Sequence, residues 1–221
     1  MKYSLRNRAA RAARRGFTLI ELCATVGILG LVTLSVHSVA DSSDRLSKYT
    51  TVRARMLGQG NEALTRATAE LSNAGISTLS AGAWGPSGAS TVDFLVVTGS
   101  NGDDPIWSTT RRLGVILSDG EIDNGLDDDS DGLVDERRLV FVRDAGGAGQ
   151  KQIVLCNNLC ETFPGESING ADDNGNGLID ETGFCAFVTG NGVELRIALQ
   201  AQDGEGGVLT ETFVTRVYPR N

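Results

Sequence analysis

Histidine and aromatic residues are scarce in this chain of 221 residues, in which aromatics make up 5%. His37 is the one histidine, and it lies in an apolar stretch with no partner visible in the sequence. Because no activated serine or cysteine stands out either, the chain lacks the groupings that acid–base and nucleophilic catalysis require. Its glycine-rich stretches also lack the spacing of a phosphate-binding loop. The sequence therefore predicts neither an enzyme nor a nucleotide site.

Clustered cations are missing from the chain beyond residue 75. The whole sequence has 20 basic and 28 acidic residues and a net charge of −8, and six of the basic residues lie among the first 16. Removal of that segment would change the net charge to −14. Proteins that bind nucleic acid neutralise its phosphates with clustered Lys and Arg. We therefore expect no nucleic-acid partner.

Acidic residues are absent from the first 16 positions, where the six basic ones stand. The positive-inside rule keeps such a segment in the cytoplasm. From Phe17 to about Val39 the chain is apolar over on the order of 20 residues, which is enough to cross a hydrocarbon core of about 30 Å. The sequence therefore predicts a cytoplasmic leader at 1–16, an inner-membrane span at 17–39 and a periplasmic head. The basic residues of the leader are Lys2, Arg6, Arg8, Arg11, Arg14 and Arg15.

The only obvious processing signal, Gly16, lies before the apolar stretch, whereas a secretory signal is cut after it. Cleavage at Gly16 would leave the anchor on the mature protein. Glu21 is the only charged residue between Arg15 and Asp41, and a carboxylate in lipid is costly unless it has a partner. The amine that cleavage creates on Phe17, presented by a neighbouring subunit, is the simplest partner. The alternative is an uncleaved signal anchor with an accidental glycine.

The run Gly16-Phe17-Thr18-Leu19-Ile20-Glu21 resembles the cleavage and methylation site of type IV pilins and type II secretion pseudopilins. The resemblance implies a structural filament subunit that a prepilin peptidase cuts after Gly16 and methylates on Phe17. It gives Glu21 the assembly role of the family glutamate. Its partners would be other pilin or pseudopilin subunits, the peptidase and the inner membrane, with secreted cargo as a further candidate.

A finer resemblance rests on residues 66–75 and the strand-rich region that follows them, which look like J-type minor pseudopilins and W-type minor pilins. It implies a subunit near a pseudopilus tip, or one that primes a pilus. Many family helices carry a proline midway through the anchor, where this chain has Ser38. Because Pro86 is the first proline, nothing forces a kink before it.

Beyond Asp41 the segment becomes polar, yet apolar residues still recur at intervals of three and four. This is the pattern of an amphipathic helix, and Asn73 with Gly75 suggests its end. One continuous helix over 17–75 would be roughly 85 Å long at 1.5 Å per residue. The predicted buried stripe consists of Leu46, Tyr49, Val52, Met56, Leu57, Ala63, Leu64, Ala67, Leu71 and Ala74.

The remaining residues, 76–221, are long enough for one domain with its own core. Short runs rich in Val, Ile, Leu and Phe alternate there with glycine-rich breaks, which is typical of strands. Hairpin turns are expected at 145–149 and 203–207. The predicted fold class is α+β, with domains at 1–16, 17–75 and 76–221. The expected strands cover residues 91–98, 113–117, 139–143, 152–156, 184–189, 193–200 and 212–218.

An acidic segment occurs twice: residues 121–136 return as residues 166–181 without a gap. In each copy, oxygen-bearing residues stand at alternate positions, a glycine follows, and an apolar residue precedes another carboxylate. A loop wraps a hard cation in this way, and calcium accepts more protein ligands than magnesium does. Because strand-like runs follow both copies, we expect loops that connect strands. The alternative is a pair of solvated acidic turns.

Both copies resemble the first nine positions of EF-hand, dockerin and thrombospondin-type calcium loops. Because converging carboxylates repel one another without a cation, we expect two structural calcium ions that stabilise the folded head. Their affinity should be modest, as is typical of extracellular sites. Where an EF-hand has its bidentate Glu, this chain has Arg138 and Gly183, so Glu136 and Glu181, or a distant residue, are the candidate substitutes. The candidate ligands are Asp127, Asp129, Asp131, Leu133, Asp135 and Glu136 in the first copy, and Asp172, Asn174, Asn176, Leu178, Asp180 and Glu181 in the second.

Three of the four cysteines lie in the head, where an oxidising periplasm permits a disulfide. A bond between Cys160 and Cys185 would close the second acidic loop at its base. A bond between Cys156 and Cys185 is nearly as reasonable, and three buried thiols are the remaining alternative.

A second class of function is a membrane-anchored adhesin or binding module that uses the acidic loops for recognition. Binding modules of this kind favour a large exposed aromatic platform. Trp84 and Trp107 are isolated in the sequence, so that feature is not evident.

Overall fold

The computed structural model of the chain describes residues 17–81 and 87–220. The predicted leader and Gly16 lie outside these residues, as does Trp84. The described chain forms two compact units, one ending at Ser47 and the other beginning at Lys48, and the long helix α1 (Leu19–Leu71) contributes to both.

The first unit consists of the apolar half of α1. Its start is a capping box: the N–H and hydroxyl of Thr18 donate to Glu21 at 3.0 Å each, and the N–H of Glu21 donates back to the Thr18 hydroxyl at 3.3 Å. Hydroxyl groups within the segment bond to carbonyls one turn earlier, as Thr33 does to Leu29 at 2.8 Å. The helix is long and apolar enough to cross a membrane, and its apolar side chains are exposed in the isolated chain.

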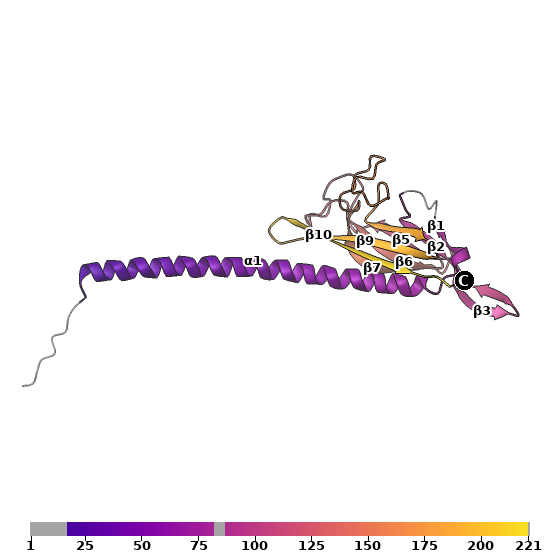
Figure 1. The fold of residues 1–221 in the computed structure, drawn as a ribbon, viewed down its shortest axis with the longest axis horizontal. Coiled ribbons are helices and arrows are strands. Elements are labelled where there is room, and N and C mark those ends of the chain that lie inside the picture. The colour runs from indigo at the N-terminus through magenta and orange to yellow at the C-terminus, as the bar shows by residue number, and fades with distance from the viewer. Residues whose placement is uncertain (1–16, 82–86, 221) are drawn as a thin grey trace, which may run out of the picture. The chain divides into compact units, whose positions relative to one another are not determined.

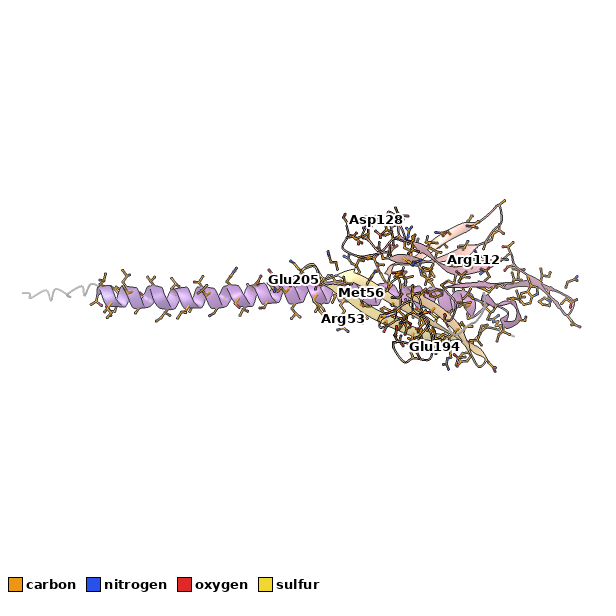
Figure 2. The ribbon with its side chains drawn as sticks, turned by 90° about the horizontal axis from the view of Figure 1, so that it is seen from above. Arg53, Met56, Arg112, Asp128, Glu194 and Glu205 are labelled. Carbon is orange, nitrogen blue, oxygen red and sulfur yellow. The ribbon has the colours of Figure 1, made fainter. Side chains whose placement is uncertain are left out.

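The second half of α1 belongs to the head and packs on the sheet. Its buried residues recur at intervals of three and four, as the amphipathic pattern predicts. Leu46, Tyr49 and Leu57 of the predicted stripe are exposed instead. Ion pairs on either side fix the helix: Arg53 meets Glu211 at 2.6 Å, and Glu70 meets Arg111 at 2.5 Å. Figure 2 labels Arg53 and Met56 on this part of the helix. The buried positions are Met56, Gly60, Ala63, Leu64, Ala67 and Leu71.

The strands of the head form an antiparallel sheet in the order β1-β2-β5-β6-β7-β9-β10, with β8 also paired to β9 (Figure 1). A separate hairpin pairs β3 with β4. The sheet strands are β1 (Ser80–Ala81), β2 (Thr91–Phe94), β5 (Arg111–Leu117), β6 (Arg137–Arg143), β7 (Lys151–Leu159), β8 (Phe184–Thr189), β9 (Gly192–Gln202) and β10 (Val208–Val217), and the hairpin strands are β3 (Val97–Asn101) and β4 (Asp104–Trp107).

The α+β organisation is confirmed, because one long apolar helix precedes a strand-rich domain. Five of the predicted runs lie within single strands, and the run at 212–218 extends one residue beyond β10. The hairpins at 145–149 and 203–207 connect β6 to β7 and β9 to β10. The run at 91–98 divides into β2 and the start of β3. Strand β4 is an addition that its sequence does not suggest, since it contains Pro105.

The end of α1 differs from the expected glycine cap. The helix stops at Leu71, and Asn73 donates its side-chain amide to the carbonyl of Ala69 at 2.9 Å. Gly75 has φ −76°, so it does not adopt the left-handed conformation of a terminal glycine. A Cβ on Gly75 would lie 2.4 Å from the ring of Trp107, so this position is a glycine because the indole packs on it.

Candidate metal centre

The two acidic segments are loops between strands, the first joining β5 to β6 and the second joining β7 to β8. Their backbones follow the same course at an offset of 45 residues. The N–H of Ser118 donates to the carbonyl of Glu136 at 3.0 Å, and the N–H of Phe163 donates to that of Glu181 at 2.8 Å. Positive φ angles recur in pairs: 102° and 85° at Gly120 and Gly165, 78° and 81° at Gly125 and Gly170, 64° and 72° at Ser130 and Gly175, 88° and 90° at Gly132 and Gly177, and 46° and 51° at Asp135 and Asp180.

The glutamate that opens each copy of the repeat organises its loop. Glu121 accepts the N–H of Asp129 and that of Asp135, both at 3.1 Å. Glu166 accepts the equivalent N–H groups of Asn174 at 3.0 Å and Asp180 at 3.1 Å. These two glutamates are not among the residues predicted for the site. Both copies of the repeat begin with Glu, and this shared position could have indicated a role for the two residues. They were missed because the calcium-loop pattern starts six residues later.

The first loop brings three of its predicted ligands together. Ligand oxygens of Asp127, Asp129 and Asp131 lie within 4.8 Å of one another. One oxygen of Asp127, Oδ1, is buried without a hydrogen-bond partner. Asp128 marks the position of this loop in Figure 2. Leu133 is buried and anchors the loop to the head.

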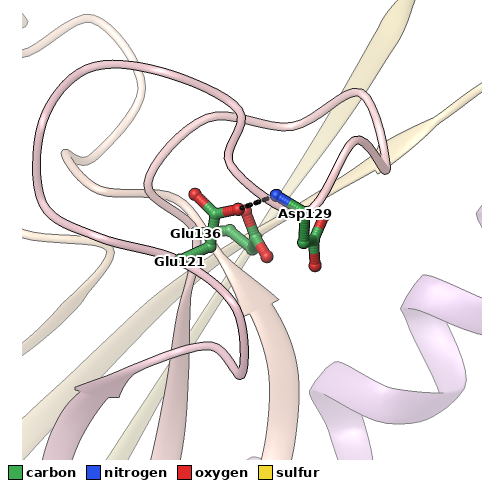
Figure 3. Close-up of side chains that lie close together, drawn as sticks. All are labelled: Glu121, Asp129 and Glu136. Carbon is green, nitrogen blue, oxygen red and sulfur yellow. Dashed lines mark hydrogen bonds between the residues drawn. The ribbon is translucent and has the colours of Figure 1, made fainter.

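A second group shares Asp129 and extends inward. Oxygens of Glu121, Asp129 and Glu136 also lie within 4.8 Å of one another, and Figure 3 shows the three carboxylates converging beneath the loop. Glu136 is only 2% exposed, and its Oε2 has no hydrogen-bond partner. Burial raises the pKa of the Glu136 carboxyl, and the nearby charges of Asp131, Glu121 and Asp129 raise it further. This arrangement is one that a cation would stabilise.

Asp135 does not join the other predicted ligands. Its carboxylate accepts the N–H of Asn124 at 3.0 Å and that of Gly125 at 2.6 Å, so it closes the start of the loop. It lies instead near Asp123 and Glu161. Arg137 supplies positive charge to that group, 3.2 Å from Asp123 and 3.8 Å from Glu161. Asp180 repeats the closing role in the second loop by accepting the N–H groups of Asn169 and Gly170.

The second loop holds its predicted ligands in a different electrostatic setting. Asp172 accepts backbone N–H groups from Gly175, Asn176 and Gly177. Glu181 is fully buried and accepts the side-chain amide of Asn176 at 2.5 Å. Arg196 lies 3.4 Å from the same carboxylate oxygen. Leu178 is buried as Leu133 is. Within the described residues, the acids of this loop form no group of three comparable to those of the first.

The predicted disulfide between Cys160 and Cys185 is not formed, because Cys156, Cys160 and Cys185 are free thiols in the structure. The sulfur of Cys185 lies 3.5 Å from the carbonyl oxygen of Ser87, and Gly183 packs against the backbone of Cys160. Burial raises the pKa of Cys156 and of Cys185 to about 12, and that of Cys160 to about 11. These three thiols are therefore packed within the head.

Glu21 lies in the first turn of α1 and Phe17 just before the helix, and both are exposed. The capping box with Thr18 gives Glu21 a local structural role that sequence reasoning missed, although the signal Thr-x-x-Glu is visible in residues 18–21. An aromatic platform does not emerge from the described residues, since the ring of Trp107 packs against Gly75.

No family model, curated protein or solved structure matches the chain. The resemblance to pilins and pseudopilins therefore depends on the residues of the N-terminal segment themselves.

Proposed function

We propose that the chain is a structural subunit, a minor pilin or pseudopilin, of a type IV pilus or a type II secretion pseudopilus. The observation that carries the proposal is the order of features at its start. A basic segment without acids ends in Gly16, and an apolar helix with one acid in its first turn follows. A prepilin peptidase would cut after Gly16 and methylate Phe17. The protein would then remain in the inner membrane with its head in the periplasm.

The unbroken course of α1 supports a subunit role. The same helix supplies an apolar segment long enough to cross a membrane and six buried positions of the head. An anchor that continues along the same helix into the head suits a filament in which apolar segments of many copies pack together. Other subunits are then the principal partners, with secreted cargo as a further candidate.

Glu21 has chemistry suited to subunit assembly. A carboxylate within lipid is costly unless a cation faces it, and cleavage after Gly16 would supply one such cation per subunit as the amine of Phe17. The capping bonds from Thr18 reach Oε2 of Glu21. Its other oxygen could accept a neighbour's amine.

The head would bind calcium through its acidic loops, and the metal would have a structural role. Carboxylates held within 4.8 Å of one another repel without a cation. A cation that binds only the folded head stabilises it by mass action. All the candidate ligands are oxygens, which is the ligand type that calcium prefers.

Replacement of Glu21 tests the subunit role. We expect Glu21→Leu to undergo normal leader removal but to be excluded from filaments sheared from the native host, because the amine of the neighbouring subunit loses its partner. The control Thr18→Val removes the hydroxyl of the capping box and retains the acid, so it should enter filaments. Incorporation of Glu21→Leu at the wild-type level would refute the assembly role.

A further inference from the structure

The two acidic loops share a backbone but differ in charge. Residues 121–136 contain eight carboxylates, whereas residues 166–181 contain five. Two of the three differences lie at positions whose carboxylates converge in the first loop: Asp129 and Asp131 correspond to Asn174 and Asn176 of the second loop. The duplicated hydrogen bonds show that neutral carboxamides support the same loop conformation. The additional charge of the first loop is therefore not needed for its shape.

The buried glutamates beneath the loops share one feature, because Oε2 of Glu136 and Oε2 of Glu181 both lack a hydrogen-bond partner. Their charged neighbours differ. Glu136 has no ion pair with any residue that the structure describes, and its neighbours Glu121 and Asp129 carry the same charge. The arginines that flank it in sequence are engaged elsewhere, Arg137 with Asp123 and Arg138 with Asp119. Among the described residues, the buried carboxyl group of Glu136 therefore faces two further carboxyl groups without a counter-charge.

Glu181, by contrast, has a cation supplied by the protein. Arg196 lies 3.4 Å from its Oε1 and is itself held by Glu194 at 3.1 Å and by the ring of Phe187, whose centroid is 4.7 Å away. The neighbours of Glu181 within the loop are carboxamides, and Asn176 donates to it at 2.5 Å. The three groups equivalent to the first cluster, Glu166, Asn174 and Glu181, carry two negative charges beside one guanidinium.

From this difference we infer that the two loops are not equivalent cation sites, an inference that rests on the cation-binding role proposed for the head. The first loop binds one divalent cation through Glu121, Asp129 and Glu136. In the second loop, the guanidinium of Arg196 takes over the charge compensation that a metal provides in the first. A divalent ion would change the net charge of Glu121, Asp129 and Glu136 from −3 to −1. In the second loop, Arg196 already changes the net charge of Glu166 and Glu181 from −2 to −1.

Calcium titration of the detergent-solubilised full chain by calorimetry tests this inference. We expect one dominant site per chain. Glu136→Gln should weaken that site by about tenfold or more, because calcium affinity follows the charge and number of its ligands. The matched variant Glu181→Gln should leave the affinity of the dominant site within about twofold of wild type, since another loop holds the metal.

Two further variants separate ligand loss from misfolding. Asp129→Asn gives the first loop the residue that the second loop has at the same place, so the fold should persist while calcium affinity falls. Arg196→Met removes the internal cation and should strengthen calcium binding at the second loop, which would appear as a second class of sites.

The calorimetric results distinguish the inequivalence of the two loops from calcium binding by the head as such. Two equal sites in the wild type, or equal losses from Glu136→Gln and Glu181→Gln, would overturn the inequivalence of the loops and leave calcium binding intact. An absence of calcium binding to the wild-type chain would overturn both the inference and the calcium role of the head.

Discussion

Gly60 occupies a position on α1 where the sheet leaves no space for a side chain. A Cβ built on it would lie 2.4 Å from the ring of Phe213, whereas one built on Gly58 would meet nothing within 4 Å. Both residues are helical glycines in the head unit. They therefore form a matched pair in which helix propensity is similar and packing differs.

We predict opposite effects of alanine at these two positions. Gly60→Ala should lower the free energy of unfolding by about 1–3 kcal/mol, because Phe213 must leave its packed position. Gly58→Ala should raise it by about 0.5–1 kcal/mol, since alanine favours the helix and meets no obstacle. Urea denaturation of both variants, followed by circular dichroism, measures the difference. Equal effects of the two substitutions would show that α1 does not pack on β10 through Gly60.

Contacts between residues close in sequence were predictable in the acidic loops, whereas contacts that depend on strand pairing were not. The duplicated spacing of Asp and Asn residues predicted the two loops and the convergence of Asp127, Asp129 and Asp131, because the spacing itself determines that geometry. Arg196 could not be predicted as a partner of Glu181. It lies 15 positions later, and only the pairing of β9 with β8 brings it beneath the loop.

At the scale of elements, Glu70 ties α1 to two strands of the sheet. Its carboxylate meets Arg111 of β5 at 2.5 Å and Arg143 of β6 at 3.1 Å. Glu70 and Arg111 are each about three-quarters buried, with 23% of the side chain exposed. Glu62 of the same helix pairs with Arg66, one turn away, and both side chains are exposed.

We expect Glu70→Gln to destabilise the head more than Glu62→Gln does. The first substitution leaves two arginines without their carboxylate. It should lower the free energy of unfolding by about 1–2 kcal/mol, because solvent screens these partly exposed pairs and keeps the loss below that of a fully buried pair. The second breaks an exposed pair within one helix, which is worth about 0.5 kcal/mol or less. Thermal unfolding of the two variants compares them directly. A larger loss of stability from Glu62→Gln than from Glu70→Gln would contradict a stabilising role for the ion pairs between α1 and the sheet.

The elements themselves were largely predictable because their patterns are local. Alternating apolar residues identified the long strands, and the spacing of three and four identified the helix. Strand β4 was missed because Pro105 argues against a strand, although β4 still pairs with β3 in a separate two-stranded sheet. The role of Gly75 was missed because its contact, Trp107, is 32 residues away in sequence.

At the scale of the whole molecule, the head is strongly acidic and two of its loops concentrate that charge. We predict that calcium raises the melting temperature of the full chain in detergent and that chelator lowers it. Mass action gives about 2.7 kcal/mol when free calcium exceeds the dissociation constant a hundredfold. Magnesium should stabilise less, because it keeps more of its water. An unchanged melting temperature on chelation would argue against a structural metal.

The central claim concerns processing at the N-terminal end, since anchoring, assembly and partners all follow from it. Mass spectrometry of the protein isolated from membranes of its native host tests this claim most directly. We predict a mature chain that begins at Phe17 and carries one methyl group on its amine. A chain that retains Met1 and the basic segment would contradict it.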